Sequence, residues 1–203
     1  MERGPALTPR VALRYEAQVR IIAGAYRSRR LVLPRGSTTR PTADRVREAL
    51  FNILGPPLAP VGEPFRVLDL FAGSGALALE ALSRGADEAV LVEQDAAASA
   101  ACARNVAALD LAAKARIVDG EVGATLRRLR GRFHWIFLDP PYGGGALDRA
   151  LRLLGQSGLV APSGLVIAEH AVASPPAERY GRLVLSDLRR WGGTAVSFYR
   201  LEL

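Results

Sequence analysis

The strongest constraint on the fold is a regular alternation of short apolar runs and helical segments between Arg66 and Glu169. We expect strands at about 66–70, 89–93, 116–118, 135–139 and 165–169, and helices at about 76–83, 96–109, 122–129 and 146–154. Repeated strand–helix units imply right-handed crossovers and a mostly parallel sheet that helices cover on both faces. Residues 182–203 then predict two antiparallel strands joined through Gly192 and Gly193, which brings the expected sheet to seven strands.

The residues before this alternation predict a smaller unit. Two short strands are expected within Gln18–Gly24 and Arg29–Pro34, and the stretch RPTADRVREALFNIL, residues 40–54, has helical spacing of its apolar residues. A connector rich in proline and glycine, Gly55–Pro64, follows. We therefore expect an extension over residues 1–55, formed by a β-hairpin and a helix, and a core domain over residues 56–203.

Positive charge is concentrated in the extension. The chain has 27 basic and 20 acidic residues, and the first 50 residues contain eleven arginines against four acidic residues, so the remainder carries sixteen of each. A basic arm beside a neutral domain is typical of proteins that bind a nucleic-acid backbone, although an unspecialised solvated arm has the same composition. The candidate RNA-binding residues are Arg27, Arg29, Arg30 and Arg40.

Composition also excludes several classes of protein. No apolar run approaches the roughly 18–20 residues of a membrane span, and the first ten residues lack the apolar core of a secretory signal. Cys102 is the single cysteine, and with only two histidines a zinc site is not expected. We expect a cytoplasmic protein that binds no metal and no membrane.

A glycine turn follows the first expected strand of the core, in VLDLFAGSGALALEAL. Gly73 and Gly75 let the backbone approach a ligand closely, and Glu93 lies 20 residues after Gly73, near the offset of an acid that binds ribose hydroxyls. This pattern indicates a cofactor that contains adenosine, either S-adenosylmethionine or a nicotinamide dinucleotide. Asp69, beside the turn, would repel a pyrophosphate but can bind an ammonium group, which favours S-adenosylmethionine.

Acidic residues end several of the expected strands. In open α/β sheets, ligands bind outside the carboxyl ends of the strands, so we expect Asp69, Glu93 and Asp139 to face one crevice. The residues after the strand at 116–118 should line the adenine end of this crevice. Glu121 is the preferred acceptor for the adenine amino group, and Asp119 is the alternative.

The strand expected at 135–139 ends in the stretch FHWIFLDPPYGGG. The carboxylate of Asp139 and the carbonyl of Pro140 can accept the two hydrogens of a nucleobase amine and direct its lone pair toward a methyl donor. The proton lost after transfer can pass to Asp139 or to water. Tyr142 presents an aromatic face on which a base can stack, with a gain of about 1–3 kcal/mol. These residues favour methyl transfer to an exocyclic amine.

The stretches DLFAGSG and DPPY, together with RIIAGAYRSRRL and RPTADRVREALFNIL, resemble the RsmD family of bacterial 16S ribosomal RNA guanine-N2 methyltransferases. The resemblance implies a Rossmann-like fold with a mostly parallel seven-stranded sheet, a terminal antiparallel hairpin and a small N-terminal β-hairpin. It also implies S-adenosylmethionine as donor, with S-adenosylhomocysteine as product, and 16S ribosomal RNA in the small subunit or its assembly intermediate as partner. The implied catalytic residues are Asp139, Pro140, Pro141 and Tyr142. The candidate cofactor-binding residues are Asp69, Phe71, Ala72, Gly73, Ser74, Gly75, Glu93, Gln94, Asp119, Gly120, Glu121, Val122 and Asp139.

Two other functions stay open. An amino-methyltransferase acting on adenine N6 in DNA or another RNA shares the DPPY stretch, but only 61 residues follow Tyr142, too few for a separate recognition domain. An NAD-dependent oxidoreductase fits the glycine turn and Glu93 but leaves residues 139–142 without a role. Arg40 has two possible ligands, RNA and the methionine carboxylate. We expect a monomer.

Overall fold

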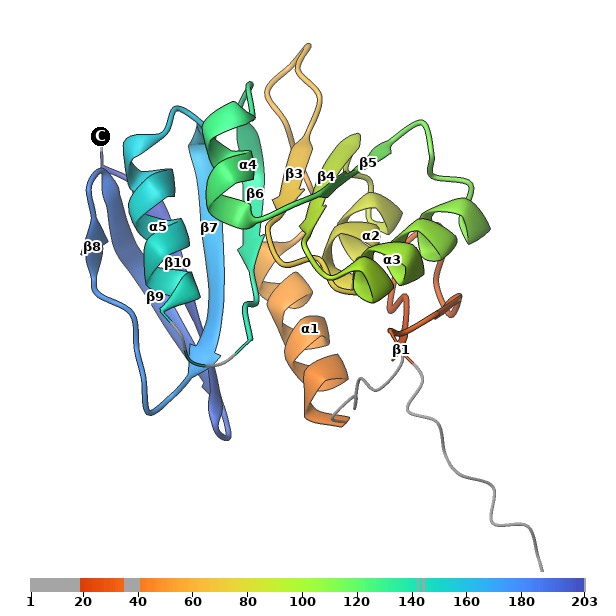
Figure 1. Ribbon diagram of the computed structural model, residues 1–203, viewed down its shortest axis with the longest axis horizontal. Coiled ribbons are helices and arrows are strands. Elements are labelled where there is room, and N and C mark those ends of the chain that lie inside the picture. Colours follow the sequence, from red (N-terminus) through yellow and green to blue (C-terminus); the bar gives the residue numbers. More distant parts are fainter. Residues whose placement is uncertain (1–18, 35–40, 142, 144, 203) are drawn as a thin grey trace, which may run out of the picture.

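The computed structural model describes residues 19–34, 41–141, 143 and 145–202 (Figure 1). Its main sheet consists of β3 (Arg66–Asp69), β4 (Glu88–Glu93), β5 (Ala115–Asp119), β6 (Phe133–Leu138), β7 (Val160–Ala171), β8 (Arg179–Tyr180), β9 (Leu183–Trp191) and β10 (Thr194–Leu201). Their order is β5-β4-β3-β6-β7-β10-β9-β8. Strands β5 to β7 in this order pair in parallel, whereas β10, β9 and β8 are added antiparallel.

Helices cover both faces of the sheet (Figure 1). They are α1 (Pro41–Leu54), α2 (Ala76–Ser83), α3 (Ala96–Ala108), α4 (Val122–Arg128) and α5 (Ala146–Gln156). One buried cluster joins α1, α2 and α3 to one face, and a second joins α4 and α5 to the other. Because β6 lies between these two layers, all its residues are buried. The strand order reverses between β3 and β6, which is where open α/β sheets bind ligands.

The predicted alternation is confirmed, with differences at the ends of elements. Strand β6 ends at Leu138, one residue before Asp139, because Leu138 is its last residue paired with β7. Strand β7 begins at Val160, five residues earlier than predicted. The prediction of seven strands was wrong by one, since the two-residue β8 pairs with β9 and makes the sheet eight-stranded. So short a strand has no periodicity that a sequence pattern can show.

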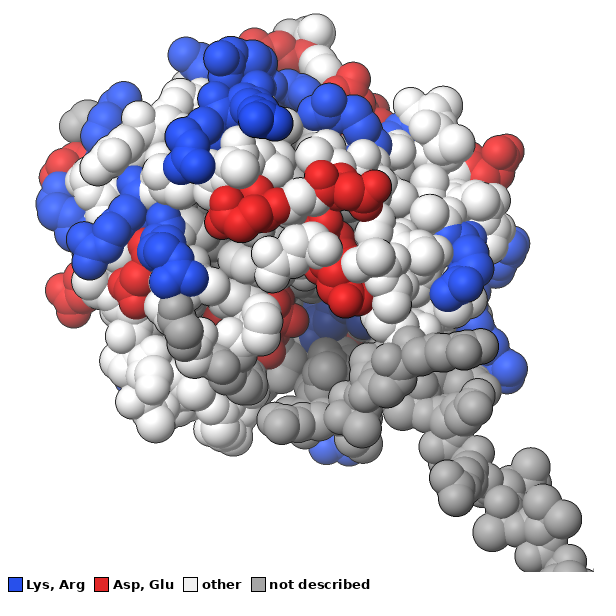
Figure 2. Space-filling view, viewed as in Figure 1, with Lys and Arg blue, Asp and Glu red and all other residues white. Residues whose placement is uncertain are grey.

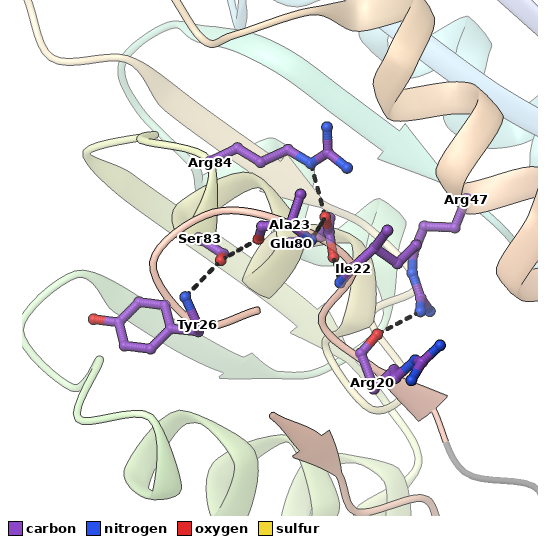
Figure 3. A network of polar contacts seen from close by, with 8 residues as sticks. All are labelled: Arg20, Ile22, Ala23, Tyr26, Arg47, Glu80, Ser83 and Arg84. Atoms are coloured by element: carbon purple, nitrogen blue, oxygen red, sulfur yellow. Dashed lines mark hydrogen bonds and ion pairs between the residues drawn. The ribbon is translucent and has the colours of Figure 1, made fainter. Parts of the chain in front are cut away.

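The predicted N-terminal hairpin is formed by β1 (Val19–Arg20) and β2 (Arg30–Leu31), which pair antiparallel. Its connecting loop lies against α2, where the fully buried Glu80 accepts the backbone N–H groups of Ile22 at 2.7 Å and Ala23 at 3.0 Å (Figure 3). Ser83 accepts the N–H of Tyr26 at 3.0 Å. The hairpin is therefore attached to the core by polar groups that are shielded from water.

Helix α1 packs on the sheet itself. The ring of Phe51 contacts those of Trp135 and Phe137 at centroid distances of 6.0 and 5.8 Å, and the guanidinium of Arg84 lies 4.9 Å from its centre. Residues on both sides of the expected boundary thus share one core, and the division at residue 55 remains a prediction. In the described part of the chain, no helix is long and apolar enough to cross a membrane.

Candidate functional site

Three carboxylates lie at the ends of three neighbouring strands, on the face that α1 covers. Asp69 pairs with Phe137 on β6, and Phe137 pairs with Ile167 on β7. Side chains two positions apart on a strand share a face, so Asp139 and Glu169 follow Phe137 and Ile167 on the face that carries Asp69. The structure therefore brings Asp69 and Asp139 together as predicted and adds Glu169 to them.

A pocket of about 310 Å³, here termed the strand-end pocket, opens beside these residues. It is lined by the hairpin, α1, the glycine turn and two of the acids, through Val19, Leu33, Pro34, Val46, Arg47, Leu50, Phe71, Ala72, Gly73, Ser74, Ala76, Leu77, Asp139 and Glu169. The N-terminal extension thus forms one wall of the pocket, and the strand ends form another. The pocket is large enough for a small molecule or an extruded base.

Asp69 is an unusual buried acid. It is 1% exposed, and neither carboxylate oxygen has a hydrogen-bond partner in the part of the chain that the structure describes. Burial raises its pKa to about 7; the backbone N–H groups of Ala78 and Phe71 oppose this without reaching hydrogen-bond geometry, and the charges of Asp139 and Glu93 add to it. A cationic group beside the glycine turn would stabilise its ionised form.

Asp139 is the first residue after β6, and part of its surface is exposed to solvent. Protein atoms around its carboxylate nevertheless desolvate the charged form and raise its pKa to about 6. Pro140, which follows, is buried, and Pro141 is exposed. Tyr142 lies outside the described residues. The strand tip therefore holds an acid of perturbed pKa on a backbone that two prolines stiffen.

The two glycines of the turn have different surroundings. Gly75, at φ +82°, would place a Cβ 2.9 Å from Sγ of Cys102, so packing against α3 excludes a side chain. Gly73, at φ +55°, would place a Cβ with no atom within 4 Å, and this glycine lines the strand-end pocket. Cys102 is buried, and burial raises the pKa of its thiol to about 12.

Glu93 supports the glycine turn from the end of β4. Its Oε2 accepts the N–H of Gly73 at 2.8 Å, and its Oε1 accepts the N–H groups of Gln94 at 2.9 Å and Asp95 at 2.8 Å. Asp119 is its partner in the register of β4 and β5, and the hydroxyl of Ser99 donates to Oδ1 of Asp119. Two predicted cofactor acids therefore lie side by side at the carboxyl edge of the sheet.

Glu121 caps helix α4. Its two carboxylate oxygens accept the N–H groups of Gly123 at 2.8 Å and Ala124 at 2.7 Å, and these bonds lower its pKa. It also lines a second pocket of about 320 Å³, together with Phe71, Gln94, Val122, Gly123, Arg127, Ala146, Arg149, Ala150 and Leu153. Each oxygen of Glu121 can accept a second hydrogen bond, so Glu121 and Asp119 both remain candidate acceptors for the adenine amino group.

The predicted RNA-binding arginines have different environments. Arg27 and Arg30 are exposed on the hairpin. Arg29 is also exposed, but its Nη2 donates to the carbonyl of Ala108 at 2.7 Å, at the C-terminal end of α3. Arg40 lies outside the described residues. The hairpin thus offers two arginines to a ligand and uses a third to attach itself to the core.

Two charged residues of the strand-end pocket were not among those predicted from the sequence. Arg47 on α1 is buried, and its Nη2 donates to the carbonyl of Arg20 at 2.7 Å (Figure 3). Glu169 lines the strand-end pocket beside Asp139. Glu169 could have been found from the sequence, because it ends an expected strand just as Asp139 does. Arg47 could not, because nothing in the sequence of α1 distinguishes it from Arg45.

Charged side chains are unevenly distributed on one face of the core. Figure 2 shows acidic side chains near the middle of one face and basic side chains gathered along its upper border. Between β5 and α4, a hollow of about 520 Å³ has four arginines among its lining residues, Arg66, Arg116, Arg128 and Arg130. Residues 56–203 are neutral in sum, and on this face the acidic side chains are concentrated near the middle, whereas exposed ion pairs such as Arg66–Glu88 also occur on the core.

Comparison with known proteins shows the family to which the chain belongs. A family model described as Conserved hypothetical protein 95 matches residues 19–200. The chain is 43% identical over 155 residues to Ribosomal RNA small subunit methyltransferase D of Escherichia coli strain K12, and the match covers 76% of each chain. It is 34% identical over 157 residues to the protein of the same name from Haemophilus influenzae, with 76% of this chain and 79% of the relative covered.

A solved structure of an Escherichia coli protein described as a candidate methyltransferase, YhhF, has a TM-score of 0.77 and 38% identity, and the match covers 91% of this chain and 98% of that chain. The strand order, the glycine turn and the strand-end acids therefore define a Rossmann-like methyltransferase. More narrowly, the chain belongs to the Conserved hypothetical protein 95 family, also called the RsmD family. The resemblance to this family that the sequence motifs indicated is confirmed.

Proposed function

We propose that this protein transfers a methyl group from S-adenosylmethionine to the exocyclic N2 of a guanine in 16S ribosomal RNA. Relatives named Ribosomal RNA small subunit methyltransferase D support this RNA as the substrate. The observation that carries the proposal is the strand tip, where Asp139, which two prolines follow, lines a pocket that the glycine turn also lines. We further propose a cytoplasmic monomer that acts on the small subunit or an assembly intermediate.

The described residues fit S-adenosylmethionine as the donor. Asp69 is a buried carboxylate without a hydrogen-bond partner among them, and the open side of Gly73 leaves room for a ligand against the turn. We propose that Asp69 and residues 71–75 hold the methionine end, Glu93 and Gln94 the ribose, and residues 119–122 the adenine. When bound, this group supplies an electrophilic methyl.

The strand tip would position the nucleophile. In the proposed complex, the carboxylate of Asp139 accepts one hydrogen of N2 and the carbonyl of Pro140 accepts the other, which aims the nitrogen lone pair. A carboxylate with a pKa of about 6 is ionised at neutral pH and can accept this bond. The proton that N2 loses after transfer then goes to Asp139 or to water. Tyr142 would stack on the base.

Labelled methyl transfer to purified small ribosomal subunits that lack this modification tests the proposal. We expect label in 16S ribosomal RNA, and mass spectrometry of the digested RNA should identify N2-methylguanosine. Duplex DNA serves as the control and should stay unlabelled. Label in adenine N6, in DNA or in RNA, would instead support the adenine methyltransferase.

Calorimetric titration tests the cofactor separately. S-adenosylhomocysteine should bind, and NAD should not. Binding of NAD without binding of S-adenosylhomocysteine would overturn the methyltransferase assignment of the site and favour an oxidoreductase. This measurement needs no RNA, so it distinguishes a wrong cofactor from a wrong acceptor.

A further inference from the structure

Glu169 has no role in the chemistry described above, yet it occupies a central position. It lies on β7 one residue beyond the pair Leu138–Ala168, next to the strand tip that carries Asp139. It lines the strand-end pocket and also a smaller pocket of about 160 Å³ that Pro140 and Pro141 line as well. Glu169 therefore borders both pockets.

The backbone of Glu169 is held firmly. Glu169 is paired with Val196 on β10, so β7 is fixed by strands on both sides at this end. The next residue, His170, is buried, and its Nε2 lies 2.9 Å from Oγ of Ser197. A carboxylate on such a rigid support can select between ligands by hydrogen bonding, because it does not move away from a mismatched partner.

A second hydrogen-bond acceptor beside Asp139 can distinguish guanine from adenine. On the edge of guanine, the N1–H donor lies beside the N2 amine, whereas adenine has a bare N1 lone pair beside its N6 amine. An ionised carboxylate only accepts hydrogen bonds. A carboxylate next to the group that holds the amine therefore binds the N1–H of guanine and repels the N1 of adenine.

We propose that Glu169 binds the N1–H of the target guanine while Asp139 and Pro140 hold its N2, so that this subsite selects guanine over adenine. The inference rests on the proposed function and adds the residue that reads the base. A hydrogen bond to a charged group corresponds to about a 10- to 100-fold effect on binding. Adenine would form no such bond, and the carboxylate of Glu169 would repel its N1 lone pair.

The test compares guanine with 2-aminopurine, which keeps the 2-amino group but has an acceptor at N1. The modified nucleotide is first mapped with the wild-type protein. Subunits are then reconstituted with 16S ribosomal RNA that carries guanine or 2-aminopurine at that position. We expect the wild type to prefer guanine by at least about 10-fold in kcat/KM. Glu169→Gln should reduce this preference at least fivefold, because its amide can donate to N1 of the analogue.

The matched control is Glu178→Gln, the same change at an exposed position outside both pockets. It should keep the wild-type preference, and both variants should bind S-adenosylhomocysteine with wild-type affinity, which shows that they are folded. An unchanged preference in Glu169→Gln, with an active wild type, would overturn this inference alone. Absence of guanine-N2 methylation by the wild type would overturn the proposed function.

Discussion

The backbone N–H of Ile22 donates a hydrogen bond of 2.7 Å to Oε2 of Glu80, although the two residues are 58 positions apart. Oε1 of the same carboxylate accepts the N–H of Ala23 at 3.0 Å and Nε of Arg84 at 2.7 Å. Glu80 is fully buried, so water cannot replace these bonds when the carboxylate is removed. One side chain therefore links the N-terminal hairpin to the helix that follows the glycine turn.

Replacement of this carboxylate should destabilise the protein strongly. Glu80→Ala leaves two backbone N–H groups and the Arg84 guanidinium without their acceptor, and we expect the free energy of unfolding to fall by about 3–5 kcal/mol. Urea unfolding measures this change. Glu88→Ala is the control, because its ion pair with Arg66 at 2.9 Å is solvent-exposed and should contribute less than about 1 kcal/mol. Equal losses in the two variants would contradict the structural role of Glu80.

The hairpin loop makes a close approach that a matched pair of glycines can test. Gly24 and Gly62 both have φ +84°, but an added Cβ meets the carbonyl oxygen of Ser83 at 1.8 Å in the first and nothing within 4 Å in the second. Gly62→Ala should cost only the backbone strain, about 1 kcal/mol. Gly24→Ala must also displace the loop, so we expect a loss of stability at least 2 kcal/mol larger, measured by urea unfolding. Similar losses would show that the loop moves freely.

Local periodicity explains why most of the fold was predictable. Alternation of apolar strands and amphipathic helices predicts a sheet of this class, and the acids that end strands then have to meet at one edge. Asp69, Glu93 and Asp139 lie at this edge, but of the three only Asp139 lines the strand-end pocket, so the prediction that all three face one crevice is not fully confirmed. These acids lie at the same edge because of the arrangement of the sheet, which the alternation of strands and helices predicts, and not because of any single contact.

Features that depend on long-range contacts were not predictable in the same way. Nothing near Arg29 in the sequence indicates that its guanidinium reaches the carbonyl of Ala108, 79 positions away. Glu80 lies within an apolar helical pattern, and its two backbone partners come from a loop that precedes it by more than 50 residues. The role of Glu169 requires knowing that β7 lies beside β6 with α1 over the same face.

Asp69 should make stability depend on pH. Its pKa in the folded state is about 7, against 3.8 for an ordinary aspartate, so the folded protein binds a proton that the unfolded chain releases between these values. Its contribution to stability is complete below about pH 4 and is lost as the pH rises through 7, by at most about 4 kcal/mol. Asp69→Asn should therefore flatten the change in unfolding free energy between pH 5 and pH 8.

Urea unfolding at both pH values measures this difference, and Asp187→Asn is the control. Asp187 forms an exposed ion pair with Arg189 at 2.8 Å, so its replacement removes one charge without changing a buried group. The control should keep the pH dependence of the wild type. If Asp69→Asn keeps it as well, the acid is not the group whose protonation stabilises the folded state.

Asp139 should control the rate of methyl transfer. Its pKa of about 6 predicts that the single-turnover rate on small ribosomal subunits rises with pH, with a midpoint near 6, because the ionised carboxylate accepts the hydrogen of N2. Asp139→Asn should lower the rate at pH 8 by at least about 100-fold. Calorimetric titration should show S-adenosylhomocysteine affinity within about threefold of the wild type. A tenfold loss of this affinity would mean that Asp139 serves mainly to bind the cofactor.

The exposed arginines of the hairpin should contribute to the salt dependence of RNA binding. Arg27 and Arg30 are exposed, and removing one arginine that binds a phosphate should reduce the slope of log affinity against log salt by about 0.7–0.9. For Arg27→Ala/Arg30→Ala we therefore expect a slope smaller by about 1.5, measured by filter binding of 16S ribosomal RNA at several salt concentrations. Arg179→Ala/Arg190→Ala removes the same charge from the opposite end of the sheet, on β8 and β9, and should leave the slope nearly unchanged. If both pairs reduce the slope equally, the RNA responds to net charge rather than to the hairpin.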